Sequence, residues 1–101
     1  MLKNFRTYQL AVNFYRQTQC QKLPSALRDQ FAKAASSIAL NLAEGTGRRT
    51  KADQKRFFTI AMGSLRECQA ILDLAYLDKH PAKLTVDLLA AHLYKLIKSY
   101  D

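Results

Sequence analysis

Four polar side chains on two predicted helices have the types and the spacing that could support acid–base chemistry. They are Asn41, Glu44, Ser64 and Glu67. The two members of each pair are three residues apart, so they share one face of a helix. Two carboxylates brought together in this way could transfer protons, but no nucleophile, metal-ligand set or phosphate-binding loop accompanies them. We therefore favour a structural polar clasp, in which Arg48 or Arg66 neutralises a carboxylate and the amide satisfies a helix end.

A basic cluster suggests a different kind of chemistry, the binding of phosphate groups. Its members are Arg48, Arg49, Lys51, Lys55 and Arg56. The last two are expected on the first turns of a helix, where backbone amides also favour anions. Contact with the phosphate backbone of RNA or DNA would be strongly salt dependent and would have little sequence preference. No aromatic residue lies between positions 48 and 56 to stack on bases, and a solvated charged face is the alternative.

The histidines do not belong to a metal or nuclease motif. A di-iron centre in a helical bundle uses Glu-x-x-His pairs, and neither His80 nor His92 has a glutamate three residues before it. The HEPN ribonucleases, another small helical class, use an arginine followed four to six residues later by a histidine, a spacing that is absent here. We expect no enzymatic activity and no metal or cofactor, and an enzyme that uses Asn41, Glu44 and Glu67 is the least favoured reading.

Length and composition favour one helical domain over residues 1–101. The chain is 49% hydrophobic and 24% charged, and its three glycines and two prolines leave little material for turns. No apolar run approaches the roughly 18 residues that span a bilayer, and a signal peptide is not apparent. We expect a cytoplasmic protein with no membrane partner, in which Cys20 and Cys68 are reduced.

The net charge of +8 is concentrated in the first half of the chain. Residues 1–51 hold nine Lys or Arg against two acids, a net of +7, whereas residues 52–101 hold seven against six, a net of +1. This asymmetry indicates an anionic partner, although solubility alone could explain it.

Apolar periodicity predicts four helices, over residues of about 4–22, 25–45, 51–78 and 81–100. In the first, the most regular apolar stripe is flanked by further apolar residues, which suggests burial on two sides. The stripe consists of Phe5, Tyr8, Val12 and Tyr15, and the flanking residues are Leu10, Ala11 and Phe14. The third has a heptad-like seam that includes Phe58, Leu65 and Leu72. Ser25 is expected to cap the second helix, Gly45 and Gly47 to end it, and Thr50 with Asp53 to cap the third.

Small residues predict a close crossing of the second and third helices. Ala35, Ser36 and Ala39 lie on the second and are expected to face Gly63 on the third. On this basis Gly63→Leu should lower stability by roughly 1–3 kcal/mol. Short connections make neighbouring helices antiparallel, so the expected fold is all-α, an up-down-up-down four-helix bundle. The broad apolar stripes fit either a compact core or a contact between subunits.

Two segments carry a family resemblance, namely Ala34 to Arg48 and the block Ala61-Met-Gly-Ser-Leu-Arg-Glu67. They resemble the signature blocks of the bacterial four-helix-bundle family typified by proteins encoded in intervening sequences of 23S ribosomal RNA genes. The resemblance implies an antiparallel bundle that assembles into a homopentameric ring. A related branch includes the accessory variability protein of diversity-generating retroelements, a basic pentamer that binds nucleic acid and a reverse transcriptase. This chain departs from many relatives by having Lys33 alone where they have an arginine pair, and Ala39-Leu40 where they have a proline.

These observations together predict a non-enzymatic, oligomeric scaffold or adaptor with a basic surface. Its expected partners are other copies of itself, assembled as a pentamer, and RNA, DNA or a protein that processes nucleic acid. The alternative is a homo-oligomeric protein-interaction module that has no nucleic-acid ligand.

Overall fold

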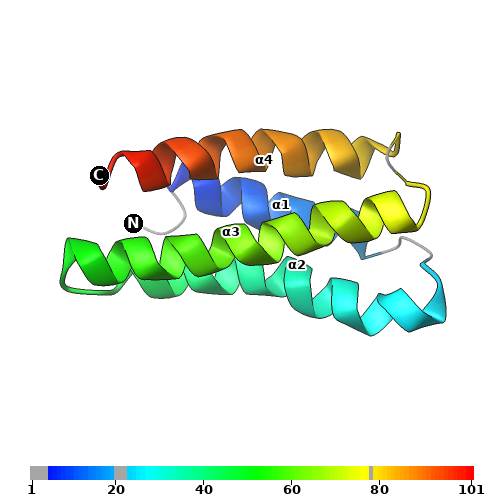
Figure 1. Cartoon of the computed structure of the whole chain (residues 1–101), viewed down its shortest axis with the longest axis horizontal. Helices are drawn as coiled ribbons and strands as arrows, with labels where there is room; N and C mark the ends of the chain where they lie inside the picture. The colour runs from blue at the N-terminus through cyan, green and yellow to red at the C-terminus, as the bar shows by residue number, and fades with distance from the viewer. Residues whose placement is uncertain (1–4, 20–22, 78) are drawn as a thin grey trace.

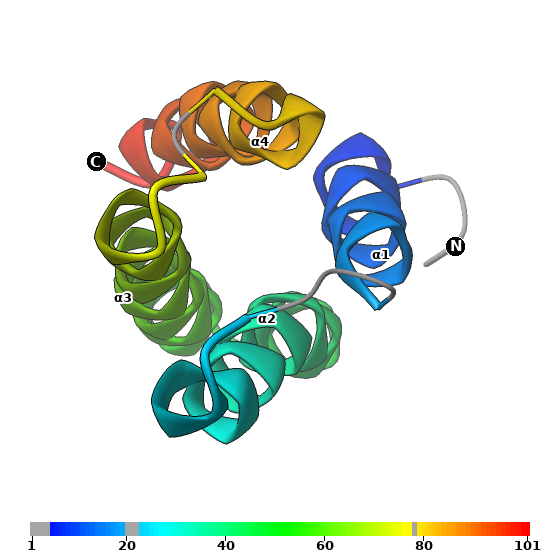
Figure 2. The same cartoon turned by 90° about the vertical axis from the view of Figure 1, so that its right-hand side faces the viewer.

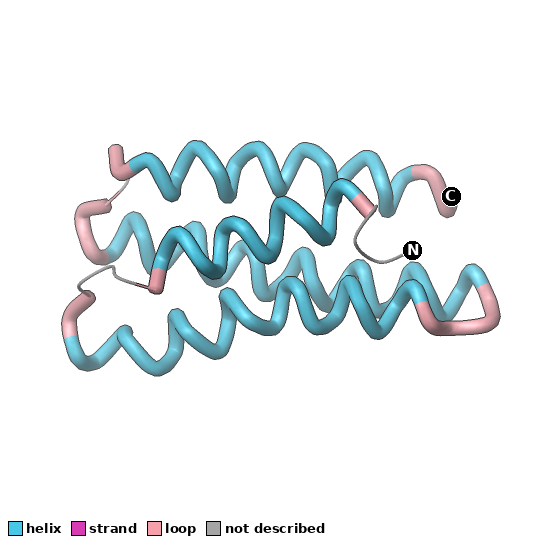
Figure 3. Tube along the Cα trace, turned by 180° about the vertical axis from the view of Figure 1, so that it is seen from behind, coloured by secondary structure: helices cyan, strands magenta, loops and turns pink. Residues whose placement is uncertain are grey.

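Four helices make up the fold. The computed structural model describes residues 5–19, 23–77 and 79–101. Within them the helices are α1 (Arg6–Thr18), α2 (Ser25–Thr46), α3 (Lys51–Leu74) and α4 (Pro81–Lys98), and no strand occurs in this part of the chain. Figure 1 and Figure 3 show them lying along the long axis of the molecule and joined by short loops. The predicted all-α class and its four helices are confirmed.

The helices surround one apolar core. Seen from the end in Figure 2, they follow one another in chain order around it, and Figure 1 shows the chain reversing direction at each connection. Every helix contributes completely buried side chains, for example Phe14, Ile38, Leu65 and Leu93. The predicted seam of α3 is largely in this core, since Phe58, Ala61, Leu65, Cys68 and Leu72 are all buried.

The first helix buries a different face from the one that its most regular stripe suggested. Its core residues are Leu10, Ala11 and Phe14, which the sequence placed beside that stripe. Tyr8 and Tyr15 of the stripe itself are half-buried on the flank of α1. The helix is therefore apolar on two sides, as predicted, but one of these sides stays partly open to solvent.

The helix bounds differ from the predicted ones mainly at the ends of α1 and α3. The first helix was expected over 4–22 and is observed over Arg6–Thr18; positions 4 and 20–22 of that prediction, including Cys20, lie outside the described residues. The third was expected to continue to residue 78, which is also outside the described residues, but it ends at Leu74. The second and fourth agree within two residues at each end.

A Schellman motif explains the early end of α3. The backbone N–H of Leu77 donates to the carbonyl of Leu72 at 2.7 Å, and the N–H of Tyr76 donates to that of Asp73 at 3.1 Å. Tyr76 has a φ of 58°, the left-handed conformation that glycine usually supplies at this position. The sequence gives no glycine here, and for this reason the motif was missed.

The capping predictions were right for α3 and wrong for α2. Thr50 accepts a hydrogen bond from the backbone N–H of Asp53 at 3.1 Å, as predicted. Ser25 is instead the first residue of α2, and Pro24 occupies the N-cap position without a side-chain hydrogen bond. The proline already has an N-cap backbone conformation, with ψ of 140°, so the helix starts one residue earlier than a serine cap would allow. At α4, the Nδ1 atom of His80 accepts from the N–H of residue 82 at 3.0 Å, a cap that sequence reasoning missed.

Gly47 is the C-cap residue that ends α2, as predicted, but without the expected positive φ, and Gly45 has a different role. Gly47 follows α2 with a φ of −88°, and none of the described glycines has a positive φ, so helix termination does not rest on that property. Gly45 lies inside α2, where a Cβ atom would be 2.6 Å from the Phe58 ring. The close approach of α2 and α3 therefore occurs at Gly45.

Gly63 is not at the predicted helix crossing. It is exposed, and a Cβ atom placed there would meet nothing within 4 Å. The predicted destabilisation by Gly63→Leu is therefore not expected, because no helix contact exists there to be overpacked. Of the predicted partners on α2, Ala35 is buried in the core, whereas Ser36 and Ala39 are half-buried. The prediction failed because helical periodicity identifies faces but does not fix the rotation of one helix against another.

The buried thiol of Cys68 should make stability fall at alkaline pH. Burial, and to a smaller extent the charge of Glu67, raises the pKa of Cys68 from 9.0 to about 12. Between these values the unfolded chain loses the proton and the folded chain keeps it. The free energy of unfolding should therefore lose up to about 1.4 kcal/mol per pH unit in this range, relative to Cys68→Ala. Denaturant titrations of both proteins from pH 8 to 11 test this, and parallel pH dependences would contradict it.

No helix among the described residues is long and apolar enough to cross a membrane.

Candidate nucleic-acid interface

The basic cluster lies where α2 turns into α3. The connection between the two helices is only four residues long, so it brings Arg48 beside the second turn of α3. There the guanidinium carbon of Arg48 lies 4.6 Å from the centroid of the Phe57 ring, and that of Arg56 lies 4.4 Å from the same centroid. A half-buried aromatic ring thus holds two cationic groups of the cluster by cation–π contact.

Carboxylates on the same helices also hold these two arginines. Glu44 accepts a hydrogen bond from Arg48 at 2.5 Å, and Asp53 pairs with Arg56 at 3.4 Å. The carbonyl of Arg48 accepts from the side chain of Gln54 at 3.0 Å, which fixes the backbone of the connection. The Nε atom of Arg48 is buried without a hydrogen-bond partner in the described structure. The two guanidiniums are therefore positioned groups rather than freely moving surface charges.

The remaining cations of the cluster divide into one paired and two unpaired residues. Lys55 forms an ion pair with Asp101, just beyond α4. The hydrogen bond and charge of Lys55, helped by Lys98, hold the pKa of Asp101 below its usual range. Arg49 and Lys51 are exposed and have no ion pair with any described residue. The cluster thus has five cations and three carboxylate partners, which leaves a local excess of positive charge.

Phe57 is the residue that sequence reasoning missed. It directly follows the cluster, but its place beside the apolar seam of α3 suggested a core role. The signal that could have found it is the short connection, because reversing the chain within four residues places positions 48 and 57 opposite each other.

The predicted polar clasp forms only in part. The amide of Asn41 donates to the carbonyl and the hydroxyl of Ser37, each at 2.9 Å, and this hydroxyl lies 2.8 Å from that of Ser64 on α3. Glu44 pairs with Arg48, as one of the two predicted neutralising partners. Of these contacts, the one between Ser37 and Ser64 joins α2 to α3 near the middle of the bundle, through a serine that the sequence did not single out.

Glu67 does not join the other clasp residues. It accepts a hydrogen bond from Gln30 at 2.9 Å, near the start of α2. Gln30 and Glu44 are 14 positions apart on this helix, which corresponds to about 20 Å along its axis. The structure therefore does not bring the two carboxylates together as an acid–base pair. In the described part of the chain, no group of three or more His, Cys, Asp or Glu side chains could hold a metal ion.

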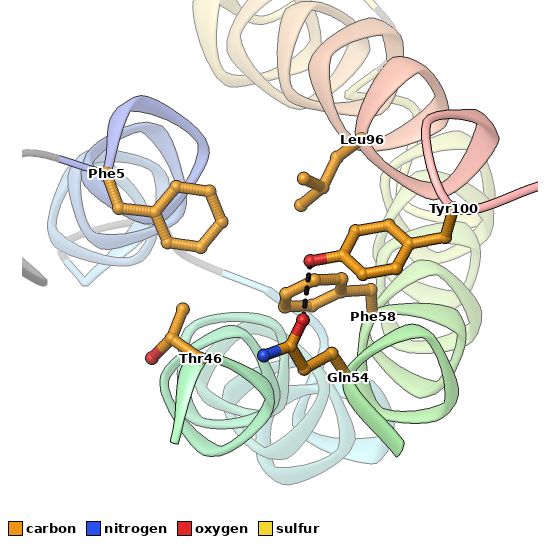
Figure 4. Close-up of a pocket in the computed structure, with 6 residues that line it drawn as sticks. All are labelled: Phe5, Thr46, Gln54, Phe58, Leu96 and Tyr100. Carbon is orange, nitrogen blue, oxygen red and sulfur yellow. Dashed lines mark hydrogen bonds between the residues drawn. The ribbon is translucent and has the colours of Figure 1, made fainter. Parts of the chain in front are cut away.

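A small pocket lies beside the cluster, at the same end of the molecule. It has a volume of about 260 Å³ and is lined by Phe5, Thr46, Gln54, Phe58, Leu96 and Tyr100. Figure 4 shows the hydroxyl of Tyr100 pointing to the side chain of Gln54, to which it donates at 2.9 Å. Because Gln54 in turn binds the carbonyl of Arg48, this chain of hydrogen bonds connects the end of α4 to the basic connection.

Comparison of the sequence with known protein families identifies the family to which the chain belongs. A search of curated proteins found no match. The family of 23S rRNA-intervening sequence proteins matches residues 4–99, nearly the whole chain, and so confirms the resemblance carried by the two signature blocks: this protein belongs to that family.

Proposed function

We propose that this protein is a non-enzymatic scaffold or adaptor of the cytoplasm, an antiparallel four-helix bundle that assembles into a homopentameric ring. In this proposal the basic cluster binds the phosphate backbone of RNA or DNA, alone or together with a protein that processes nucleic acid. The observation that carries the proposal is the pair of guanidiniums held on Phe57, next to the unpaired Arg49 and Lys51.

The chemistry of the cluster favours phosphate over bases as its ligand. The Phe57 ring is half-buried and already contacts two guanidiniums, so a base that stacked on it would have to compete with these contacts. Guanidinium groups match the geometry of phosphate oxygens, and positioning them beforehand lowers the entropy lost on binding. Several copies in one ring would add avidity to individually weak contacts.

The salt dependence of binding tests this function. If Arg48, Arg49, Lys51 and Arg56 each contact one phosphate, the logarithm of affinity for duplex DNA should fall with that of salt at a slope of about −3 to −4 per subunit. Arg49→Ala/Lys51→Ala should reduce affinity at 50 mM salt by at least about tenfold and the slope by about 2. The measurement is fluorescence anisotropy with labelled RNA and DNA 20-mers at 50 and 200 mM salt.

A matched control separates a site from general charge. Lys33→Ala/Lys79→Ala removes the same charge from two exposed positions outside the cluster. It should lower affinity much less than the first double variant. An equal loss in both variants, or no binding of the natural protein at 50 mM salt, would overturn the assignment.

Removing the carboxylate of Asp101 should increase nucleic-acid affinity. Lys55 is the one member of the cluster that is paired with the region after α4. Asp101→Asn keeps the size of the side chain but releases this lysine for phosphate, which should steepen the salt slope by about 1. The same substitution in a Lys55→Ala protein should have little effect. An equal increase in both backgrounds would mean that Asp101 acts only through net charge.

A specific observation favours the alternative function, a homo-oligomeric protein-interaction module without a nucleic-acid ligand. Several large apolar side chains outside the cluster are exposed, among them Leu40, Leu84 and Tyr94. Such residues are typical of protein contacts. Oligomers that form while nucleic acid stays unbound would support this alternative.

A further inference from the structure

An apolar groove lies between α1 and α2. It has a volume of about 390 Å³ and is lined by Val12, Tyr15, Arg16, Ser36, Ala39 and Leu40. Two of the small residues that were expected to pack against α3 instead line this groove. A second depression, of about 250 Å³, continues it along α1 past Tyr8. Small residues between larger ones allow another helix to approach closely.

The outer side of α4 presents a row of apolar side chains. It consists of Leu84, Leu88, Ala91 and Tyr94, which we call the α4 row. Leu84 is 76% exposed, and the other members are exposed as well. The opposite side of the same helix, which includes Val86 and Leu93, is buried in the core. Apolar residues on both sides of a helix are typical of a helix that is packed against other protein surfaces on both sides.

One molecule cannot bring the groove and the α4 row together. Figure 2 shows α4 on the opposite side of the bundle from α2, and the core lies between them. A second copy can supply the missing surface to each. Contacts between two different faces of identical chains are heterologous, and they generate closed rings or open filaments.

The two surfaces offer one pair of opposite charges, Arg16 at the groove and Asp87 at the α4 row. Arg16 lines the groove and forms no ion pair with a described residue. The described part of α1 contains no acid. Asp87 lies on α4 between two members of the α4 row; its carboxylate is half exposed, accepts a hydrogen bond from the Gln69 amide at 2.9 Å and pairs with Lys83 at 3.6 Å, so its second oxygen is the one left for a neighbouring copy. An arginine at the groove and a carboxylate at the row would favour one orientation of the contact.

We propose that the α4 row of one copy packs into the α1–α2 groove of the next, with Arg16 of one copy near Asp87 of the other. This assignment rests on the oligomeric state in the proposed function and identifies the two faces that form it. The second copy is the favoured occupant because the chain itself carries both the groove and a row of matching chemistry.

Two single substitutions on exposed residues test the contact without disturbing the fold. Leu84→Glu places a charge on the row and Leu40→Glu places one in the groove. Each should raise the dissociation constant between subunits at least tenfold in sedimentation equilibrium of the full chain. Leu74→Glu is the matched control, since Leu74 is as exposed as Leu40, at 67%, but lies on α3 outside both faces. Thermal unfolding followed by circular dichroism checks that all three variants are folded.

Mixing the variants distinguishes a heterologous contact from a symmetric one. The Leu84→Glu protein keeps an intact groove and the Leu40→Glu protein keeps an intact row, so an equimolar mixture should form a one-to-one dimer and stop there. Arg16→Glu should weaken assembly, and adding a separate Asp87→Arg protein should restore it, because each protein then meets an opposite charge at both of its faces.

The outcomes also separate this inference from the proposed function. Oligomers that survive both Leu84→Glu and Leu40→Glu, or that Leu74→Glu disrupts equally, would overturn the assignment of faces but leave the scaffold intact. If the natural protein is monomeric across the whole concentration range, both the assignment of the two faces and the proposed ring are wrong. The nucleic-acid titration would still test phosphate binding by the basic cluster independently.

Discussion

Phe58→Ala is expected to lower the free energy of unfolding by about 3–5 kcal/mol. The ring is 2% exposed and packs against two other aromatic rings, with centroids 6.1 Å from Phe5 and 5.6 Å from Tyr100. Its removal leaves a cavity at the place where α1, α3 and the end of α4 meet, and it also removes the edge-to-face contact with Tyr100. Urea denaturation at neutral pH measures the loss.

Phe57→Ala provides the comparison for this change. Phe57 is the adjacent aromatic residue, but it is half-buried and contacts arginines at the surface. Its replacement should cost much less stability and should instead reduce nucleic-acid affinity if the basic cluster binds phosphate. Similar losses of stability at the two positions would show that the core does not end between them.

Gly45→Ala should destabilise the protein by about 1–3 kcal/mol, although alanine is the better helix former. The new methyl group would lie 2.6 Å from one ring carbon of Phe58 and 3.2 Å from the Cβ atom of Phe57. The Phe58 ring is held in the core and cannot move aside cheaply, so α2 and α3 would have to separate.

The matched substitution Gly63→Ala should have the opposite effect. It too replaces a glycine inside a helix, but at an exposed position where the methyl group meets nothing within 4 Å. It should raise the free energy of unfolding by up to about 1 kcal/mol through helix propensity alone. Chemical denaturation of both variants gives the comparison, and a loss of stability at Gly63 would restore the crossing that the sequence suggested.

The two buried sites should also be coupled. In a Phe58→Ala protein, the ring that obstructs a side chain at position 45 is gone. Gly45→Ala should therefore cost less there than in the natural protein, with a coupling energy of about 0.5–3 kcal/mol. Additive losses would place the obstruction elsewhere.

The parts of the fold that could be predicted depend on contacts between near neighbours in the sequence. The seam of α3 is visible because residues three and four apart share a face, and the Thr50 cap because it acts on an amide three residues later. The end of α3 could not be predicted, since it uses Tyr76 in the left-handed conformation, which residues other than glycine rarely adopt.

The candidate site was predictable in its charges but not in its geometry. The five cations are adjacent in the sequence, whereas their positions depend on the path of a short connection and on the rotation of α2 against α3. These two quantities decide that Arg48 lies on Phe57, that Gly45 is at the close approach in place of Gly63, and that Glu67 binds Gln30. Periodicity within one helix contains no information about them. Nucleic-acid binding and the pentameric ring stay predictions.

The burial of Cys68 has a practical consequence for measuring these events. A thiol that is inaccessible and neutral at pH 7–8 does not react with maleimide dyes. In a Cys20→Ser background, a cysteine introduced at the exposed Lys79 or Ser99 can therefore be labelled selectively, with the Lys55–Asp101 pair left in place. Figure 1 places the chain's last residue at the end of the molecule with the basic connection, and the α3–α4 turn at the other end. The label at the end with the basic connection would report on nucleic acid bound nearby. The label at the α3–α4 turn, at the other end of a molecule 40 Å long, would serve as the reference that binding leaves unchanged.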